Sequence, residues 1–357
     1  MIIDKFNPLQ DEMFQILDER GNVKKGYDSD LDEKTLLDLY RYMVISRMAD
    51  EKAFSLQREG RIGTYPPLRG QEAMQIGSAM AMEKGDWLFP VYRDMGAMMV
   101  RGVPFHLVFL YWMGYEEGNC FPEDANVFPI SIPVGSQISL GVGHAWAAKL
   151  KNKAHVNLVS FGDGASSETD FHDGLNFAGV FNVPTVFFCS NNQWAISVPR
   201  KTQTGAKTIA QKALAYGFNG IQVDGNDILA IYQVTREALG KARGGGGPTL
   251  IEAYGYRMGD HTTADDAKRY RSEEEVAKWE KKDPIKRFKT YLTALGILTT
   301  EIESDVEKKG EAIIREAVKN AESFVPADPE EIFKYTYEEM PTHLKDQFKE
   351  FQESLKS

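Results

Sequence analysis

The chain has 357 residues, of which 42 are Lys or Arg and 52 are Asp or Glu, so its formal net charge is −10 at pH 7. This negative balance repels nucleic-acid phosphates, and no dense basic run offsets it, which excludes the nucleic-acid-binding classes. The two cysteines, Cys120 and Cys189, are too few and too far apart for a disulfide framework or a cysteine zinc site. No apolar run approaches the roughly 18 residues of a membrane span, and the N-terminus lacks a secretory pattern, so we expect a reduced, cytoplasmic protein with no membrane segment.

The N-terminal part of the sequence predicts an arm, two helices and a loop. Residues 1–34 are polar with little periodicity and are expected to form an N-terminal arm. Residues 34–58 carry apolar side chains at helical spacing, and residues 71–83 are also helix-like. Between them, residues 60–70 (GRIGTYPPLRG) are rich in Gly and Pro, which predicts an irregular loop.

From residue 154 onward, short apolar runs rich in β-forming residues alternate with helical patterns. The apolar runs are residues 154–161, 184–190, 220–224 and 249–254. Amphipathic helical patterns follow the first run and cover residues 227–243, and the glycines at 244–247 predict a plain helix-to-strand turn. This alternation predicts an α/β fold in which a parallel sheet is flanked by helices.

The expected organisation is one α/β domain with extensions at both ends. The arm of residues 1–34 precedes the α/β domain, which covers residues 35–290. Beyond it, residues 291–357 are charged and helical in pattern, and they predict a helical C-terminal extension.

Two short polar motifs follow neighbouring strands of the predicted sheet. Gly162-Asp163-Gly164 ends the first apolar run, and Asn191-Asn192 ends the second. Because ligands collect beyond the carboxyl ends of parallel strands, these motifs should lie side by side. The glycines let the backbone approach a phosphate closely, while a carboxylate and an amide oxygen suit Mg²⁺. Each motif alone is most simply a turn, and only the pair indicates a site.

The pair and its surroundings (GDGASSETDFHDGLNFAGVFNVPTVFFCSNNQWAIS) resemble the alpha subunits of thiamine-diphosphate-dependent pyruvate and branched-chain 2-oxoacid dehydrogenases. The resemblance implies the thiamine-diphosphate-binding fold. It also implies that Asp163 and Asn192 bind Mg²⁺ through their side chains and Trp194 through its backbone carbonyl. Gly164 and Ala165, together with the preceding Gly162, would contact the diphosphate. Trp194 replaces the family's more usual Tyr or Phe.

Two further stretches resemble cofactor-binding segments of the same family. Tyr92-Arg93 is similar to a Tyr-Arg pair at the cofactor phosphates, where a planar guanidinium suits bidentate contact. Residues 131–137 (SIPVGSQ) resemble the segment whose apolar residue, here Val134, supports the V-shaped cofactor beside its aminopyrimidine. In some members this stretch also binds a monovalent cation such as K⁺, for which the candidates are Ser131, Ser136 and Gln137.

Residues 256–271, which begin YRMGDHTTADD, resemble the family's active-site loop. Their histidine, His261, is the candidate catalytic residue, because an imidazole can donate to a phosphate or move a proton near neutral pH. A lone loop histidine is usually just solvated, so the motif context carries this hypothesis. No histidine–cysteine cluster surrounds His144, His155 or His172, which we expect to be packing or surface residues.

The resemblance implies oxidative decarboxylation of a 2-oxoacid, with the acyl group passed to a lipoyl group of the acyltransferase component. Pyruvate is the favoured substrate, which would make the enzyme a pyruvate dehydrogenase (acetyl-transferring), and the alternative is a branched-chain 2-oxoacid such as 3-methyl-2-oxobutanoate. The family's catalytic glutamate belongs to a separate beta subunit. The resemblance therefore implies a heterotetramer of two alpha and two beta subunits.

Two other functions compete with this interpretation. One is a nicotinamide dehydrogenase, for which the nearest glycine pattern is Gly141-Val142-Gly143, but Trp146 stands where the third glycine belongs. The other is a non-catalytic subunit that retains the fold without binding cofactor. The presence of Asp163, Asn192, Arg93 and His261 argues against it.

Overall fold

Five parallel strands form the central sheet of the protein, in the order β1-β2-β3-β7-β6. The computed structural model describes residues 1–10, 12–27 and 30–355. The sheet strands are β1 (Trp87–Phe89), β2 (Asn157–Gly162), β3 (Thr185–Asn191), β6 (Asn219–Asp224) and β7 (Thr249–Tyr254). A separate antiparallel hairpin pairs β4 (Trp194–Ala195) with β5 (Val198–Pro199) directly after β3. The predicted α/β class with a parallel sheet is confirmed.

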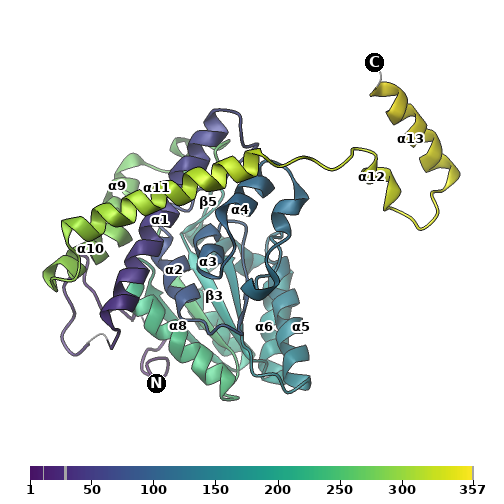
Figure 1. The fold of residues 1–357 in the computed structure, drawn as a ribbon. Helices are drawn as coiled ribbons and strands as arrows, with labels where there is room; N and C mark the ends of the chain where they lie inside the picture. The colour runs from purple at the N-terminus through teal and green to yellow at the C-terminus, as the bar shows by residue number, and fades with distance from the viewer. Residues whose placement is uncertain (11, 28–29, 356–357) are drawn as a thin grey trace.

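Helices cover both faces of the sheet (Figure 1). The helices are α1 (Glu33–Arg58), α2 (Glu72–Met80), α3 (Met95–Val100), α4 (Phe105–Trp112), α5 (Ser136–Leu150), α6 (Thr169–Phe181), α7 (Arg200–Gln203), α8 (Ile228–Arg243), α9 (Glu273–Glu280), α10 (Pro284–Ala294), α11 (Thr300–Glu322), α12 (Glu331–Lys334) and α13 (Thr342–Ser354). Short 3₁₀ turns add Asp163–Ser167 after β2 and Ala210–Tyr216 before β6.

Alternate side chains of each strand point to opposite faces, and both faces are buried. Leu158, Val186 and Ile251 face the core shared with α1, α2 and α8. Their neighbours Val159, Phe187 and Leu250 face a second core formed with α5 and α6. Burial on both faces explains why the sequence shows continuous apolar runs here and not an alternating pattern.

The predicted strands and helices agree with the structure to within a few residues. All four apolar runs contain a strand, and the expected helices correspond to α1, α2 and α8. The glycine run is a turn between α8 and β7, in which Gly245 and Gly247 adopt φ of +83° and +76°. β1 was not expected, because three residues are too short for a periodic signal.

The glycines Gly141 and Gly143 lie inside α5, not in a turn that follows a strand. A Cβ added to Gly141 would lie 2.5 Å from Cγ2 of Val159, so this glycine lets the helix pack closely on the sheet. The pattern therefore cannot cradle a dinucleotide, and the nicotinamide alternative loses its motif.

The polar N-terminal arm packs more closely than its composition indicates. Phe14, Ile16 and Leu17 are fully buried, and Phe14 forms an isolated parallel bridge to Val223 at the β6 edge of the sheet. Residues 11 and 28–29 of the expected arm, and residues 356–357 of the expected C-terminal extension, lie outside the described residues. The division into arm, domain and extension stays a prediction.

The C-terminal extension has two parts that differ in their contacts. α11 packs on α1 and α4, whereas α12 and α13 stand away from the body of the molecule in Figure 1. α13 has no buried residue, and Phe333 of α12 packs against Phe348 and Phe351 of α13. Among the described residues, no helix combines the length and the apolar character that a membrane span needs.

Candidate active site

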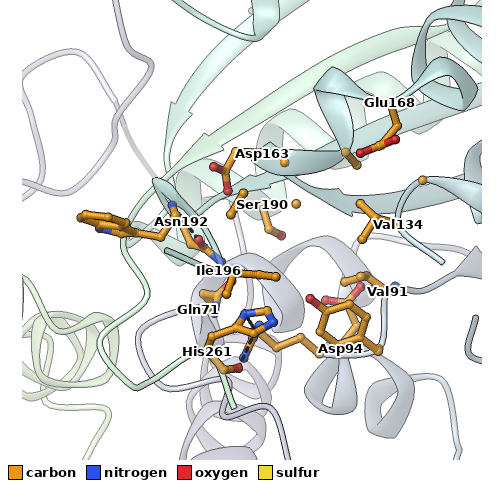
Figure 2. Close-up of a pocket in the computed structure, with 18 of the residues that line it drawn as sticks. Gln71, Val91, Asp94, Val134, Asp163, Glu168, Ser190, Asn192, Ile196 and His261 are labelled. Atoms are coloured by element: carbon orange, nitrogen blue, oxygen red, sulfur yellow. Dashed lines mark hydrogen bonds between the residues drawn. The ribbon is translucent and has the colours of Figure 1, made fainter. Parts of the chain in front are cut away.

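A cavity of about 230 Å³ opens beyond the carboxyl ends of β1, β2 and β3. In Figure 2, Asp163 and Asn192 lie close together, and Val134 lies across the pocket from Asn192. The cavity brings together every cofactor-binding residue expected from the sequence: Tyr92, Arg93, Val134, Gly162, Asp163, Gly164, Ala165, Asn192, Trp194 and His261. Their roles stay predictions, but their convergence from segments far apart in the chain defines one candidate site.

The segment after β2 presents a buried carboxylate on a tight turn. Asp163 begins a 3₁₀ helix and is 1% exposed, and burial raises the pKa of its carboxyl group to about 6. A neutral amide is its hydrogen-bonding partner, because Gln203 Nε2 donates to Asp163 Oδ2 over 2.9 Å. A Cβ added to Gly164 would lie only 2.8 Å from the Cβ of Ala195, so only glycine fits against the hairpin there.

The segment after β3 holds an amide and a carbonyl in fixed orientations. The side chain of Asn192 donates from Nδ2 to Gln71 Oε1 (3.0 Å) and accepts from the Trp194 N–H at Oδ1 (3.2 Å). The Trp194 carbonyl accepts from Arg257 Nη1 (3.2 Å). Ile196, a β-branched residue, adopts φ of +53° at the hairpin turn, a strained conformation that often accompanies functional sites.

His261 lies between two guanidinium groups. Arg93 Nη2 is 3.2 Å from His261 Nδ1 and also donates to its carbonyl, while Arg257 Nη1 is 3.4 Å from the same Nδ1. Because both neighbours can only donate, Nδ1 must accept and the ring proton must lie on Nε2. Burial, followed by Arg93 and Arg257, lowers the pKa of His261 to about 3, so the imidazole is neutral at neutral pH.

The two guanidinium groups are buried without a counter-ion. Arg93 is 6% exposed and Arg257 is fully buried, yet neither forms an ion pair with a carboxylate among the described residues. Arg93 donates to the Pro67 carbonyl, and Arg257 donates to the carbonyls of Trp194 and Ile196. Buried cations are costly unless they are paired, so this region is arranged to receive an anion.

The loop that carries His261 is fixed by side chains of its own segment. Arg257 Nη2 donates to Tyr270 Oη (2.7 Å), and Tyr270 in turn bonds to Asp265, which accepts from the His261 N–H (2.8 Å). Arg271 donates to the carbonyl of Gly259. The loop therefore holds His261 in place through both its backbone and its side chain.

Sequence reasoning missed several polar side chains at or beside the cavity, which include Asp94 and Glu168 as well as the three described next. Gln71 (2% exposed) and Ser190 (4% exposed) line it, and no described residue forms a hydrogen bond with Gln71 Nε2 or Ser190 Oγ. The third, Gln203, binds Asp163 from the segment after the hairpin. Gln71 directly follows the Gly- and Pro-rich loop of residues 60–70. Because loops often carry binding residues, its place at the end of this loop is the one sequence feature that could have identified it.

The candidate monovalent-cation residues are only partly gathered at the cavity. Gln137 lines it and donates from Nε2 to the Ser160 carbonyl over 2.8 Å. Ser131 and Ser136 do not line it, and their hydroxyls bond to each other over 2.8 Å. The cation site stays a prediction.

Histidines away from the cavity have structural surroundings. His144 stacks on His155 and bonds to Asn157, and His172 contacts Tyr216. Within the described residues, no group of three or more His, Cys, Asp or Glu side chains is placed to hold a metal ion. A metal at this cavity would therefore need amide, carbonyl and phosphate oxygens in addition to Asp163.

Comparisons with known proteins identify the family of this chain. The family described as "Dehydrogenase E1 component" matches residues 40–330. The alpha subunit of 3-methyl-2-oxobutanoate dehydrogenase from Mycobacterium tuberculosis is 45% identical over 341 residues, which cover 95% of this chain and 92% of that protein.

Two pyruvate dehydrogenase E1 component alpha subunits are nearly as similar. The one from Acholeplasma laidlawii is 44% identical over 341 residues, covering 95% of this chain and 99% of its own length. The one from Staphylococcus aureus strain Mu50 is 43% identical over 344 residues, covering 96% and 93%. The chain therefore belongs to the dehydrogenase E1 component family, whose members depend on thiamine diphosphate.

Proposed function

We propose that this chain is the alpha subunit of a 2-oxoacid dehydrogenase that oxidatively decarboxylates pyruvate and passes the acetyl group to a lipoyl group. The observation that carries the proposal is the pair of buried guanidinium groups, Arg93 and Arg257, without carboxylate partners among the described residues. Arg93 lines the same cavity as the buried carboxylate of Asp163, which forms no ion pair with a cation among the residues that the structure describes. A diphosphate carrying Mg²⁺ would satisfy both kinds of charge at once.

The residues of the cavity fit thiamine diphosphate and Mg²⁺. Gln71 Nε2 and Ser190 Oγ line the cavity without a partner among the described residues, and a ligand with many oxygens would supply acceptors. Gly164 admits no Cβ, which suits close backbone approach to a phosphate. The oxygens of Asp163, Asn192 and Trp194 are hard ligands of the kind Mg²⁺ prefers.

The proposed roles follow from these positions. Asp163, Asn192 and the Trp194 carbonyl would hold Mg²⁺, while Tyr92 and Arg93 would bind the diphosphate. The backbone of the turn would add contacts to the same group from Gly162, Gly164 and Ala165. Val134, which is 50% exposed at the cavity, would support the rings of the cofactor. When bound, thiamine diphosphate supplies the electron sink that makes loss of CO₂ feasible.

His261 would act as a hydrogen-bond donor and proton carrier at Nε2. Its Nδ1 accepts from the two guanidinium groups, which fixes the tautomer. An anion bound near Arg93 and Arg257 would offset their charge and bring the pKa of His261 closer to neutral pH, where a proton can be transferred in either direction.

A partner subunit is part of the proposal. The cavity, at about 230 Å³, lies below the roughly 300–1,000 Å³ usual for a small-molecule site, and exposed apolar side chains at Val134 and Ile196 border it. A beta subunit would complete the site and supply the glutamate that activates the cofactor. This gives a heterotetramer that serves a lipoyl-bearing acyltransferase component.

The substrate is tested by comparing two 2-oxoacids. The chain is co-expressed with its beta partner, and reduction of an artificial electron acceptor is followed with pyruvate or 3-methyl-2-oxobutanoate, with and without thiamine diphosphate and Mg²⁺. Faster cofactor-dependent turnover of pyruvate would support the proposal. Faster turnover of the branched-chain acid would favour the alternative, which the similarity to the mycobacterial protein supports equally well.

Two controls separate catalysis from fold retention. The isolated alpha chain should be inactive under the same conditions. If the mixed subunits show neither activity nor cofactor binding by calorimetry, the chain is a non-catalytic subunit and the proposal fails.

A further inference from the structure

Gln71 stands at the start of α2 with one half of its amide group bonded and the other half free. Its backbone is fixed by a turn, in which the Gln71 N–H donates to the Leu68 carbonyl and the Gln71 carbonyl accepts from Gln75. The side chain is 2% exposed and lines the cavity. Oε1 accepts from Asn192 Nδ2 over 3.0 Å, whereas Nε2 has no partner in residues 1–10, 12–27 and 30–355.

The orientation of this amide is determined by its neighbour. Asn192 Oδ1 accepts from the backbone N–H of Trp194, so Asn192 Nδ2 is the atom that faces Gln71. A donor requires an acceptor, and therefore Gln71 must present Oε1 to Asn192. Its Nε2 is left as an unsatisfied donor at the cavity.

The surroundings of Gln71 Nε2 favour an oxygen acceptor with negative charge. In Figure 2, Gln71 lies on the same side of the pocket as His261, which contacts Arg93. A buried donor without a partner is unfavourable, and the positive charge of Arg93 makes an anion the natural partner here. The part of the chain that the structure describes offers no acceptor to Gln71 Nε2, which leaves this position to a ligand.

We propose that Gln71 is a ligand-binding residue, which donates from Nε2 to an anionic oxygen and orients Asn192 through Oε1. This inference rests on the proposed function, in which two groups offer such an oxygen: the diphosphate of the cofactor and the carboxylate of the 2-oxoacid. The experiment distinguishes the two.

Two substitutions separate the two halves of the amide. Gln71→Glu keeps an acceptor for Asn192 Nδ2 but replaces the free donor by a carboxylate that repels an anion. Gln71→Met removes both bonds at similar volume. The control is Gln75→Met, one helical turn later, because the Gln75 amide is bonded within the protein to the Gly96 N–H and the Arg93 carbonyl.

The measurements use the complex of alpha and beta subunits. Calorimetry gives the Kd for thiamine diphosphate with Mg²⁺, steady-state kinetics gives KM and kcat for the 2-oxoacid, and thermal denaturation without cofactor gives Tm. We expect Gln71→Glu to weaken one of the two ligands about tenfold or more, and Gln71→Met to weaken it less. Gln71→Met leaves Asn192 Nδ2 without its acceptor but also removes an unpaired donor, so it should change the Tm of the cofactor-free complex less than Gln75→Met, which should lower it.

The pattern of effects identifies the ligand oxygen. A higher Kd for thiamine diphosphate assigns the contact to the diphosphate, and an unchanged Kd with a higher KM assigns it to the substrate carboxylate. If both Gln71 variants keep Kd and KM within twofold of the wild type, the inference is wrong although the proposed function stands. If the wild-type complex neither binds the cofactor nor turns over, both are wrong.

Discussion

Two buried charge clusters lie on either side of the start of α2, and they are satisfied in different ways. Glu72, the residue after Gln71, accepts from Arg47 Nε at 2.6 Å, and Arg47 Nη1 donates to Asp283 at 2.7 Å. All three side chains are at most 15% exposed. By contrast, Arg93 at the cavity and Arg257 behind His261 have no carboxylate partner within the part of the chain that the structure describes.

The difference separates charges used for folding from charges held for a ligand. In the Arg47 cluster the two carboxylates also accept backbone N–H groups, at Gly70 for Glu72 and at Ile285 and Lys286 for Asp283. Every charge of this cluster is paired within the chain, although Arg47 Nη2 has no hydrogen-bonding partner among the described residues. At and beside the cavity, one carboxylate and two guanidinium groups have no oppositely charged partner among the described residues. These unpaired charges lower the stability of the free protein, and a bound ligand would restore it.

The largest expected effect is a loss of folding stability when the Arg47 cluster is disrupted. Arg47→Met leaves two buried carboxylates without a cation and should lower the free energy of unfolding by about 3–5 kcal/mol, measured by chemical denaturation. The control is Arg61→Met, because the ion pairs of Arg61 with Glu59 and Glu322 are exposed and should contribute about 1 kcal/mol or less. Equal losses in the two variants would show that the Arg47 cluster is not a folding element.

The second prediction concerns the carboxylate of the incomplete cluster. The pKa of Asp163 is raised from 3.8 to about 6, so the folded state binds this proton more tightly than the unfolded state does. Stability from this group is therefore present at low pH and lost as the pH rises towards and through about 6, by roughly 3 kcal/mol in total. Asp163→Asn, which cannot ionise, should stabilise the cofactor-free protein by up to that amount at pH 8.

Thermal denaturation at pH 5 and pH 8 measures this effect. The wild type should lose more stability than Asp163→Asn between the two values, while calorimetry should show that the variant no longer binds thiamine diphosphate with Mg²⁺. A variant that is less stable than the wild type at pH 8 would mean that Asp163 contributes to folding, contrary to the comparison.

The smallest expected effect is on cofactor affinity when Arg93 is replaced. Arg93→Met should weaken cofactor binding by about 10- to 100-fold, because a hydrogen bond to a charged group contributes about 1.5–3 kcal/mol. The cofactor-free protein should remain as stable as the wild type. The pKa of His261 should rise, since Arg93 is one of the charges that lower it, and NMR titration of the ring would detect this. Unchanged cofactor affinity would remove Arg93 from the site.

Much of this site could be predicted from the sequence because its residues follow strands. Asp163 and Asn192 come directly after β2 and β3, and the carboxyl ends of parallel strands meet at one edge of a sheet. Gln71 could not be found in this way, because it precedes a helix and reaches the cavity through a loop whose path no periodic pattern describes. Its unpaired donor becomes visible only when Asn192 is seen to take the other half of the amide.

The fold shows the same limit. Long apolar runs identified β2, β3, β6 and β7, whereas β1 has three residues and carries no period. The arm was expected to be polar and irregular, yet Phe14 and Leu17 are buried in it. Their burial depends on contacts with β6 and α10 that lie more than 200 residues away in the chain, which a local pattern cannot express.

The bridge made by Phe14 also matters for the behaviour of the protein in concentrated solution. Phe14 exchanges backbone hydrogen bonds with Gln222 and Asp224 on the outer side of β6, and the segment at Val127 does the same with Leu88 on the outer side of β1. Each segment covers only a short part of its edge, but an uncovered edge can pair with the same edge of another molecule. A chain shortened beyond Phe14 would therefore expose β6 as a template for self-association, and its first defect would be aggregation and not loss of catalysis.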